Sequence, residues 1–299
     1  MVRGAWMAVA LGIVLGPCWA GAQESYPIKL KDNGKGDTSQ VDKQSAEKTE
    51  IKVLDAQGNT VQNTQRDKNE VLVYRETILE KFDGQIRPTR LKREYEKAQI
   101  KTGDKTETLP YQGKTVLIEK TEAGYRFRIE GGEELLGKDA ETLDKEFKRL
   151  DSQPDMNKLM LPAGPVKVGD SWNIKVQELV GHLAKSGMEV EAAGGTGTAK
   201  LLRVYQQDGR QFGVIDLRIE FPLKAIGDGV QKQVVQPGAK VNLRTVLDAC
   251  IDGTSCSGSS KYTTQVDALI DTEAGGVKLK VTFTVHGDGQ HAHKELPKK

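Results

Sequence analysis

Apolar residues occupy every second position in several stretches of the chain, which is typical of strands with one buried face. In 277–285, valine, leucine and phenylalanine alternate with lysine and threonine, and 215–221 alternates in the same way. The stretches 115–121 and 125–130 are expected to pair as a hairpin, and Asp208-Gly209 marks the turn of another. The sequence therefore predicts a mainly β protein, close to α+β, with antiparallel curved sheets.

One segment has helical spacing instead. Within 139–151, the apolar residues Leu143, Phe147 and Leu150 fall at positions i, i+4 and i+7 of an otherwise charged stretch. Asp139 is the expected N-cap. We expect one main amphipathic helix whose apolar stripe packs on a sheet face.

A stretch rich in proline and glycine, 161–172, separates the chain into two units of similar size. The predicted boundaries are a leader at 1–22, a β-rich unit at 23–160 with the helix, a second β-rich unit at 161–286, and a polar flexible tail at 287–299. Thr121–Gly124 and Thr272–Gly275 share one turn sequence. An internal duplication and the common reuse of turn residues by β proteins both explain this similarity.

Two further stretches lack a regular apolar pattern and are expected to be irregular. Residues 32–50 are polar and without apolar periodicity, so they are expected to form a loop. The glycine-rich stretch 194–197 is expected to be a flexible link.

The first residues have the features of a secretory signal. Arg3 precedes an apolar run at 6–15, and Ala20-Gly21-Ala22 is a small-residue cleavage site. Lipid attachment at Cys18 is the alternative, but Pro17 stands where such a signal needs a small flexible residue. Cleavage after Ala22 is therefore favoured, with no transmembrane segment in the mature chain. The protein is expected to be exported to the periplasm or outside the cell.

Charge and cysteine content bear on binding partners and on disulfide formation. The formal net charge is +2, and basic and acidic residues are mixed along the chain. Nucleic acid is excluded as a partner, because phosphate binding needs clustered lysine and arginine. Export places Cys250 and Cys256 in an oxidising compartment, where a disulfide across the short loop between them is expected.

The stretch Leu-Pro-x-x-Pro-Val-Lys-Val-Gly-Asp-Ser-Trp at 161–172 precedes the Asp-Gly hairpin. With this stretch and hairpin, the chain resembles exported bacterial proteins of an uncharacterised family over about Leu161 to Val285. The resemblance implies a bacterial origin and a β-rich exported domain. It implies no activity and no functional residue.

No motif indicates a reaction or a cofactor. Ser171 follows a Gly-Asp pair, but every histidine lies downstream of it and the Gly-x-Ser-x-Gly elbow is missing, so a turn serine is favoured. His286, Asp288, His291 and His293 are weak candidates for a zinc or copper site. A solvated tail is favoured over a metal site, since real sites draw ligands from rigid elements.

The amphipathic helix carries the functional prediction. If it covers the concave face of a curved sheet, lifting it opens an apolar groove for a lipid or a peptide, as in carriers of the bacterial envelope. The simpler interpretation is that its stripe is core. The candidate lining residues are Phe127, Leu143, Phe147, Leu150, Phe221 and Phe283. The sequence thus favours an exported, non-catalytic binding or structural protein, with an envelope-polymer hydrolase or an assembly protein as alternatives and the oligomeric state left open.

Overall fold

The computed structural model describes residues 24–227 and 232–297. The predicted signal peptide, including Cys18 and the cleavage site, lies outside the described residues.

The described residues form many strands and few helices. The strands are β1 (Ser25–Tyr26), β2 (Thr38–Leu54), β3 (Thr60–Glu80), β4 (Arg90–Thr102), β5 (Lys105–Thr108), β6 (Thr115–Thr121), β7 (Gly124–Ile129), β8 (Val166–Lys167), β9 (Ser171–Asn173), β10 (Met188–Val190), β11 (Thr196–Gln207), β12 (Arg210–Ile226), β13 (Gln233–Val234), β14 (Lys240–Cys250), β15 (Gly258–Ala274) and β16 (Val277–Leu296). The helices are α1 (Lys138–Ser152), α2 (Met156–Met160), the 3₁₀ helix η1 (Val176–Leu179) and α3 (Val180–Lys185).

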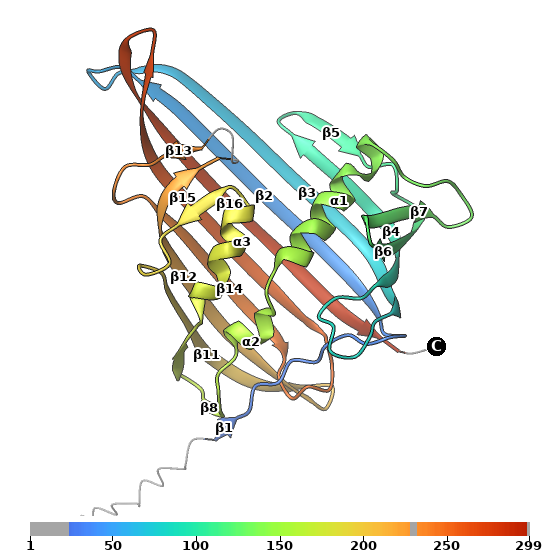
Figure 1. Ribbon diagram of the computed structural model, residues 1–299. Coiled ribbons are helices and arrows are strands. Elements are labelled where there is room, and N and C mark those ends of the chain that lie inside the picture. Colours follow the sequence, from blue (N-terminus) through green and yellow to red (C-terminus); the bar gives the residue numbers. More distant parts are fainter. Residues whose placement is uncertain (1–23, 228–231, 298–299) are drawn as a thin grey trace, which may run out of the picture.

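Fourteen of these strands belong to one open antiparallel sheet (Figure 1). Its order is β7-β6-β4-β3-β2-β16-β15-β14-β12-β11-β9, with β5 on β4 and both β10 and β13 on β12. β1 and β8 form a separate two-stranded sheet. The prediction of a mainly β protein with curved antiparallel sheets is confirmed.

The first and last long strands lie side by side at the middle of the sheet. β2 pairs with β16 along its whole length, from Thr38 opposite Leu296 to Leu54 opposite Lys280. The chain runs outward from β2 to β7 in one meander and returns from β9 to β16 in another. The division into two units near Leu161 stays a prediction, since both meanders share this one sheet.

Two segments that were expected to be irregular are strands. Residues 287–296, expected as a flexible tail, form the second half of β16 between β15 and β2. Residues 38–50, expected as a loop, form most of β2. In both segments a neighbouring strand on each side supplies backbone hydrogen bonds, and this does not depend on apolar side chains.

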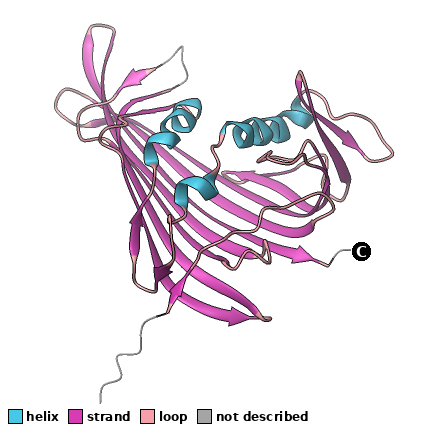
Figure 2. Cartoon of the chain, turned by 60° about the horizontal axis from the view of Figure 1, so that its bottom comes forward, coloured by secondary structure: helices cyan, strands magenta, loops and turns pink. Residues whose placement is uncertain are grey.

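The helices lie in the hollow of the curved sheet, as Figures 1 and 2 show. α1 confirms the predicted amphipathic helix, with Leu143 and Phe147 buried against the sheet. It begins at Lys138 after Gly137, so Asp139 is a first-turn residue and not the N-cap. A carboxylate in the first turn still stabilises the positive end of the helix dipole.

The concave face carries two separate apolar clusters. The N-terminal cluster surrounds the fully buried Leu72, Tyr111, Val116, Ile118 and Leu143, and the C-terminal cluster surrounds Val176, Leu201, Ile215, Phe221 and Val241. Burial of apolar side chains on this scale is the main force that stabilises a fold.

The glycine-rich stretch 194–197 is part of the second cluster and not a flexible link. A Cβ atom on Gly197 would lie 2.2 Å from Cγ1 of Val176, and one on Gly195 would lie 2.4 Å from the ring of Phe221. Only glycine permits this close approach between β11 and the side chains packed on it.

Candidate ligand-binding cavity

The strand register places a polar row on the concave face between the two apolar clusters. On β16, the side chains of Val281, Phe283 and Val285 pack against the C-terminal cluster, so later odd-numbered residues face the same way. His291 lies between Lys43 of β2 and Ser260 of β15. This arrangement interrupts the apolar surface at the centre of the sheet.

A cavity of about 210 Å³ opens above this row. Its walls combine apolar side chains, a group of serines, both described cysteines and two histidines. They are Leu30, Lys31, Asn157, Leu247, Ala249, Cys250, Ser255, Cys256, Ser257, Gly258, Ser259, Ser260, His291 and His293. The cavity is thus built from β14, β15, β16 and the loop after β14, and it is covered by α2 and the N-terminal segment.

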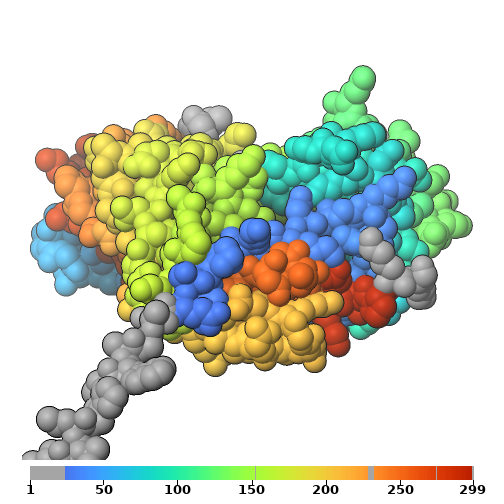
Figure 3. All heavy atoms as spheres, turned by 90° about the horizontal axis from the view of Figure 1, so that it is seen from below, coloured from blue at the N-terminus to red at the C-terminus, as the bar shows by residue number. Residues whose placement is uncertain are grey.

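The N-terminal segment, residues 24–37, crosses the lower end of the concave face. In Figure 3 this blue segment lies beside α2 and the loop before β15. Ile28 is buried in the C-terminal cluster, and the amide of Lys29 donates to the carbonyl oxygen of Ile251 over 2.8 Å. The segment is therefore attached through Ile28, with Tyr26 and Leu30 packed beside it, and through a small number of backbone hydrogen bonds.

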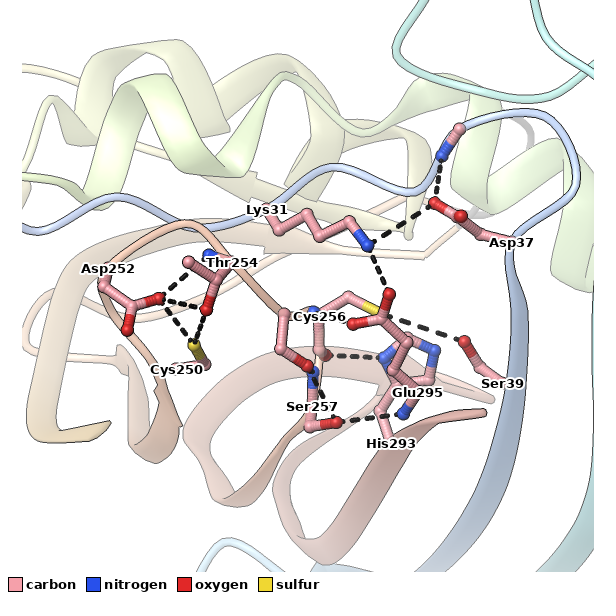
Figure 4. Close-up of polar contacts among 12 residues, drawn as sticks. Lys31, Asp37, Ser39, Cys250, Asp252, Thr254, Cys256, Ser257, His293 and Glu295 are labelled. Atoms are coloured by element: carbon pink, nitrogen blue, oxygen red, sulfur yellow. Dashed lines mark hydrogen bonds and ion pairs between the residues drawn. The ribbon is translucent and has the colours of Figure 1, made fainter. Parts of the chain in front are cut away.

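A charged network joins this segment to the end of β16 (Figure 4). Lys31 forms an ion pair with Glu295, and its Nζ lies 3.8 Å from the buried carboxylate of Asp37. Glu295 also accepts from the amide of Cys256 over 3.2 Å. Burial alone would raise the pKa of Glu295, but the hydrogen bonds from Lys31, Ser255 and Cys256 lower it to about 2.

The predicted disulfide between Cys250 and Cys256 is absent, and both residues are free thiols. Sγ of Cys250 lies 3.1 Å from the carboxylate of Asp252, whereas Sγ of Cys256 faces the hydroxyl of Ser39 at 3.8 Å (Figure 4). Each thiol has its own polar partner, so the two sulfurs do not face each other. Burial raises the pKa of Cys256.

The weak metal candidates do not converge. His286 and Asp288 are exposed on the opposite face of β16 from His291 and His293, because odd and even residues of a strand alternate. Within 24–227 and 232–297, no group of three or more histidine, cysteine, aspartate or glutamate side chains is placed to hold a metal ion.

His291 and His293 stack with ring centroids 6.3 Å apart. Nδ1 of His293 lies 2.8 Å from the carbonyl oxygen of Cys256, which fixes Nδ1 as the donor (Figure 4). His293 therefore bonds to the backbone of Cys256 and not to its thiol, which faces Ser39. Burial, and then the nearby His293 and Lys43, lower the pKa of His291, so its ring is uncharged at neutral pH.

A second buried charge cluster attaches α1 to the sheet. Arg93 of β4 is 4 % exposed and donates to Glu76 over 2.8 Å and to Glu146 of α1 over 3.1 Å. Its guanidinium lies between the rings of Tyr74 and Phe147, at 4.4 and 4.9 Å from their centroids. Burial alone would raise the pKa of Glu146, but Arg93 lowers it.

The predicted groove residues do not form one groove. Phe127, Leu143 and Phe147 are buried in the N-terminal cluster, where the rings of Phe127 and Phe147 are 5.8 Å apart, and Leu150 is half-buried. Phe221 is fully buried in the C-terminal cluster, and the half-buried Phe283 packs at its margin. None of the six lines the cavity, whose walls include polar residues that no apolar pattern predicts.

The comparisons with known proteins identify no relative. No protein-family model and no curated protein matches the chain. In structure it is similar to lipovitellin, in a structure concerned with lipid–protein interactions, at a TM-score of 0.38 and 7% identity over 89% of this chain and 26% of that one. It thus spans about a quarter of that chain.

Two outer membrane and transport proteins are less similar. An outer membrane channel from Pseudomonas putida F1 has a TM-score of 0.20 at 10% identity, over 90% of this chain and 100% of that one. The P. putida toluene transporter TodX has a TM-score of 0.18 at 8% identity, over 88% and 91% of the two chains. TM-scores this low do not establish a common fold or a common function. No helix in the described part of the chain is long and apolar enough to span a membrane.

Proposed function

We propose that the protein is an exported, non-catalytic carrier that binds one acyl chain of a lipid on the concave face of its sheet. The observation that carries the proposal is the cavity at the margin of the C-terminal cluster, where Leu30 and Leu247 line it, beneath short elements that are not part of the sheet. The signal-like residues 1–22 and the resemblance of 161–285 to exported proteins support export.

The cover of the cavity is suited to movement. α2 has only five residues, and it is held on the sheet by the buried Leu159, by Met156 and Met160, and by a hydrogen bond from Trp172 Nε1 to the carbonyl oxygen of Met160 at 2.7 Å. Methionine side chains are flexible and polarizable, so they adapt to ligands of different shape. Short helices with few contacts belong to the low-stability part of a protein.

Binding requires this cover to move. Pockets for small-molecule ligands enclose roughly 300–1,000 Å³, and the cavity of about 210 Å³ is smaller. Displacement of α2 removes Leu159, Met156 and Met160 from the C-terminal cluster and exposes part of its apolar surface. An acyl chain then replaces the contacts that α2 gives up, at about 0.8 kcal/mol for each buried methylene group.

Trp172 reports this movement directly. It is the only tryptophan beyond residue 22, and it bonds to the last residue of α2. We expect titration of the delipidated mature protein with acyl-chain lipids to change the emission of Trp172 saturably, and native mass spectrometry to show one bound lipid.

Two matched variants test whether the lipid binds in the cavity. Ser260→Leu fills the cavity from β15 and is expected to weaken binding at least tenfold, whereas Thr263→Leu puts the same side chain on the exposed convex face of β15 and is expected to leave binding unchanged. Equal binding by both variants, or no binding by the unaltered protein, contradicts the proposal.

A further inference from the structure

The cavity wall contains one charged side chain among the residues that the structure describes there, and that charge is already neutralised. Lys31 bonds to Glu295 and lies 3.8 Å from a carboxylate oxygen of Asp37. Asp252, beside the cavity, accepts hydrogen bonds from Cys250, Thr254 and the amide of Gln211. Neither a spare cation nor a spare carboxylate faces the space.

The uncharged polar groups, in contrast, are numerous. Four serines line the cavity: Ser255 and Ser257, which bond to each other, and Ser259 and Ser260. His291 faces the same space from β16, directly opposite Ser260, and its ring forms no hydrogen bond with the described residues. A neutral imidazole both donates and accepts a hydrogen bond, and this matches a hydroxyl group.

We infer that the ligand head group is uncharged and bears hydroxyl groups, as in a monoacylglycerol, and that His291 and Ser260 bind it. This inference rests on the proposed function, because it places the head group where the acyl chain enters the C-terminal cluster. It names the class of lipid: a neutral, hydroxyl-bearing head on one acyl chain.

Charged heads of either sign are disfavoured for the same reason. A buried charge is tolerated only when it is paired. An anionic head meets Lys31 already bound to Glu295, with Asp37 close behind it. A cationic head meets carboxylates that already accept hydrogen bonds. Each charged ligand therefore loses its hydration without gaining a partner.

The experiment compares four ligands with the same acyl chain, followed by Trp172 emission and native mass spectrometry. They are 1-monoolein, methyl oleate, oleate and oleylamine. We expect 1-monoolein to bind at least tenfold more tightly than oleate or oleylamine. Oleate or oleylamine binding as tightly as 1-monoolein overturns the inference and leaves the proposed function intact, whereas no binding by any of the four overturns both.

Substitutions on β16 test the role of His291 in head-group binding. His291→Leu is expected to weaken binding of 1-monoolein about three- to tenfold, as for the loss of one hydrogen bond, and to leave methyl oleate, which lacks hydroxyl groups, unaffected. His286→Leu, on the exposed face of the same strand, is expected to change neither. Ser260→Ala gives the same contrast if His291→Leu does not fold. An equal loss for both ligands contradicts the role of the residue in head-group binding.

Discussion

Replacing Arg93 by methionine tests how α1 is held over the sheet. Arg93 is 4 % exposed, and its guanidinium bonds to carboxylates from two different elements, Glu76 of β3 and Glu146 of α1. Methionine fills a similar volume and leaves both carboxylates without their cation. Removing one partner of a buried ion pair costs about 3–5 kcal/mol, which is a large part of a total stability of about 5–15 kcal/mol.

The loss has a characteristic dependence on pH. In the unaltered protein the pKa of Glu146 is lowered, so the stability from its pairing with Arg93 is complete above the ordinary glutamate pKa and is lost as the pH falls below it. In Arg93→Met the pKa of the stranded Glu146 carboxyl is expected to rise, because Arg93 no longer offsets its burial. Acidification then protonates Glu146 and removes the cost of its buried, unpaired charge, so the difference in unfolding free energy between the two proteins narrows from pH 7 towards pH 4.

Urea unfolding between pH 4 and 7 measures this difference. Arg126→Met is the control, since Arg126 is 57 % exposed and its ion pair with Glu134 spans 3.8 Å; we expect a loss below about 1 kcal/mol. Adding Glu146→Gln to Arg93→Met removes one stranded carboxylate and is expected to recover about 1–3 kcal/mol. A loss for Arg93→Met no larger than for the control, or one that does not change with pH, refutes the reasoning.

Three further predictions follow from single contacts. Gly197→Val brings a side chain into Val176 and is expected to destabilise the protein by about 1–3 kcal/mol in urea unfolding; a neutral result contradicts the close approach of η1 to β11. In Lys31→Met, the pKa of Glu295 is expected to rise from about 2 towards its ordinary value, so most of the stability that the unaltered protein loses between about pH 4.5 and 2 is already missing from the variant at neutral pH; NMR titration of the carboxyl carbon measures the pKa. Cys256→Ser is expected to leave the unfolding midpoint unchanged with or without reductant, because no disulfide is present; a reductant-sensitive midpoint in the unaltered protein would contradict it.

The strands that the sequence predicts are those with one apolar face and one polar face. Alternation located the hairpin of β6 and β7, and the turn at Asp208-Gly209 between β11 and β12 has positive φ angles of 51° and 72°, as a tight hairpin requires. Helical spacing located α1 for a related reason: its stripe packs on a sheet. In these segments the local pattern and the tertiary environment agree.

The site could not be predicted because its inner face is polar. The concave face of β2 and β16 carries polar side chains here: Ser39, Lys43, His291, His293 and Glu295. Three of them have polar partners on other segments: Ser39 contacts Cys256, Lys43 pairs with Glu70, and Glu295 pairs with Lys31. A strand with polar residues on both faces has no alternation to detect, so both segments read as loop or tail. Some of their partners lie more than 200 residues away in the sequence: Lys31 from Glu295, and Ser39 from Cys256. Only the pairing of the first and last strands brings them together.

The same polar row fixes the register of the longest strands. A shift of β16 by one residue would turn its inner side chains to the convex face, and a shift by two would keep the faces but separate Glu295 from Lys31. Gly289 adds a steric term, because a Cβ atom there would lie 2.5 Å from the ring of Tyr262 on β15, so only a glycine can lie beneath that ring. Apolar clusters alone tolerate such shifts better, since one aliphatic contact replaces another. The paired charges and the covered glycine therefore hold the two meanders in one alignment, and this alignment sets His291 opposite Ser260 in the cavity wall.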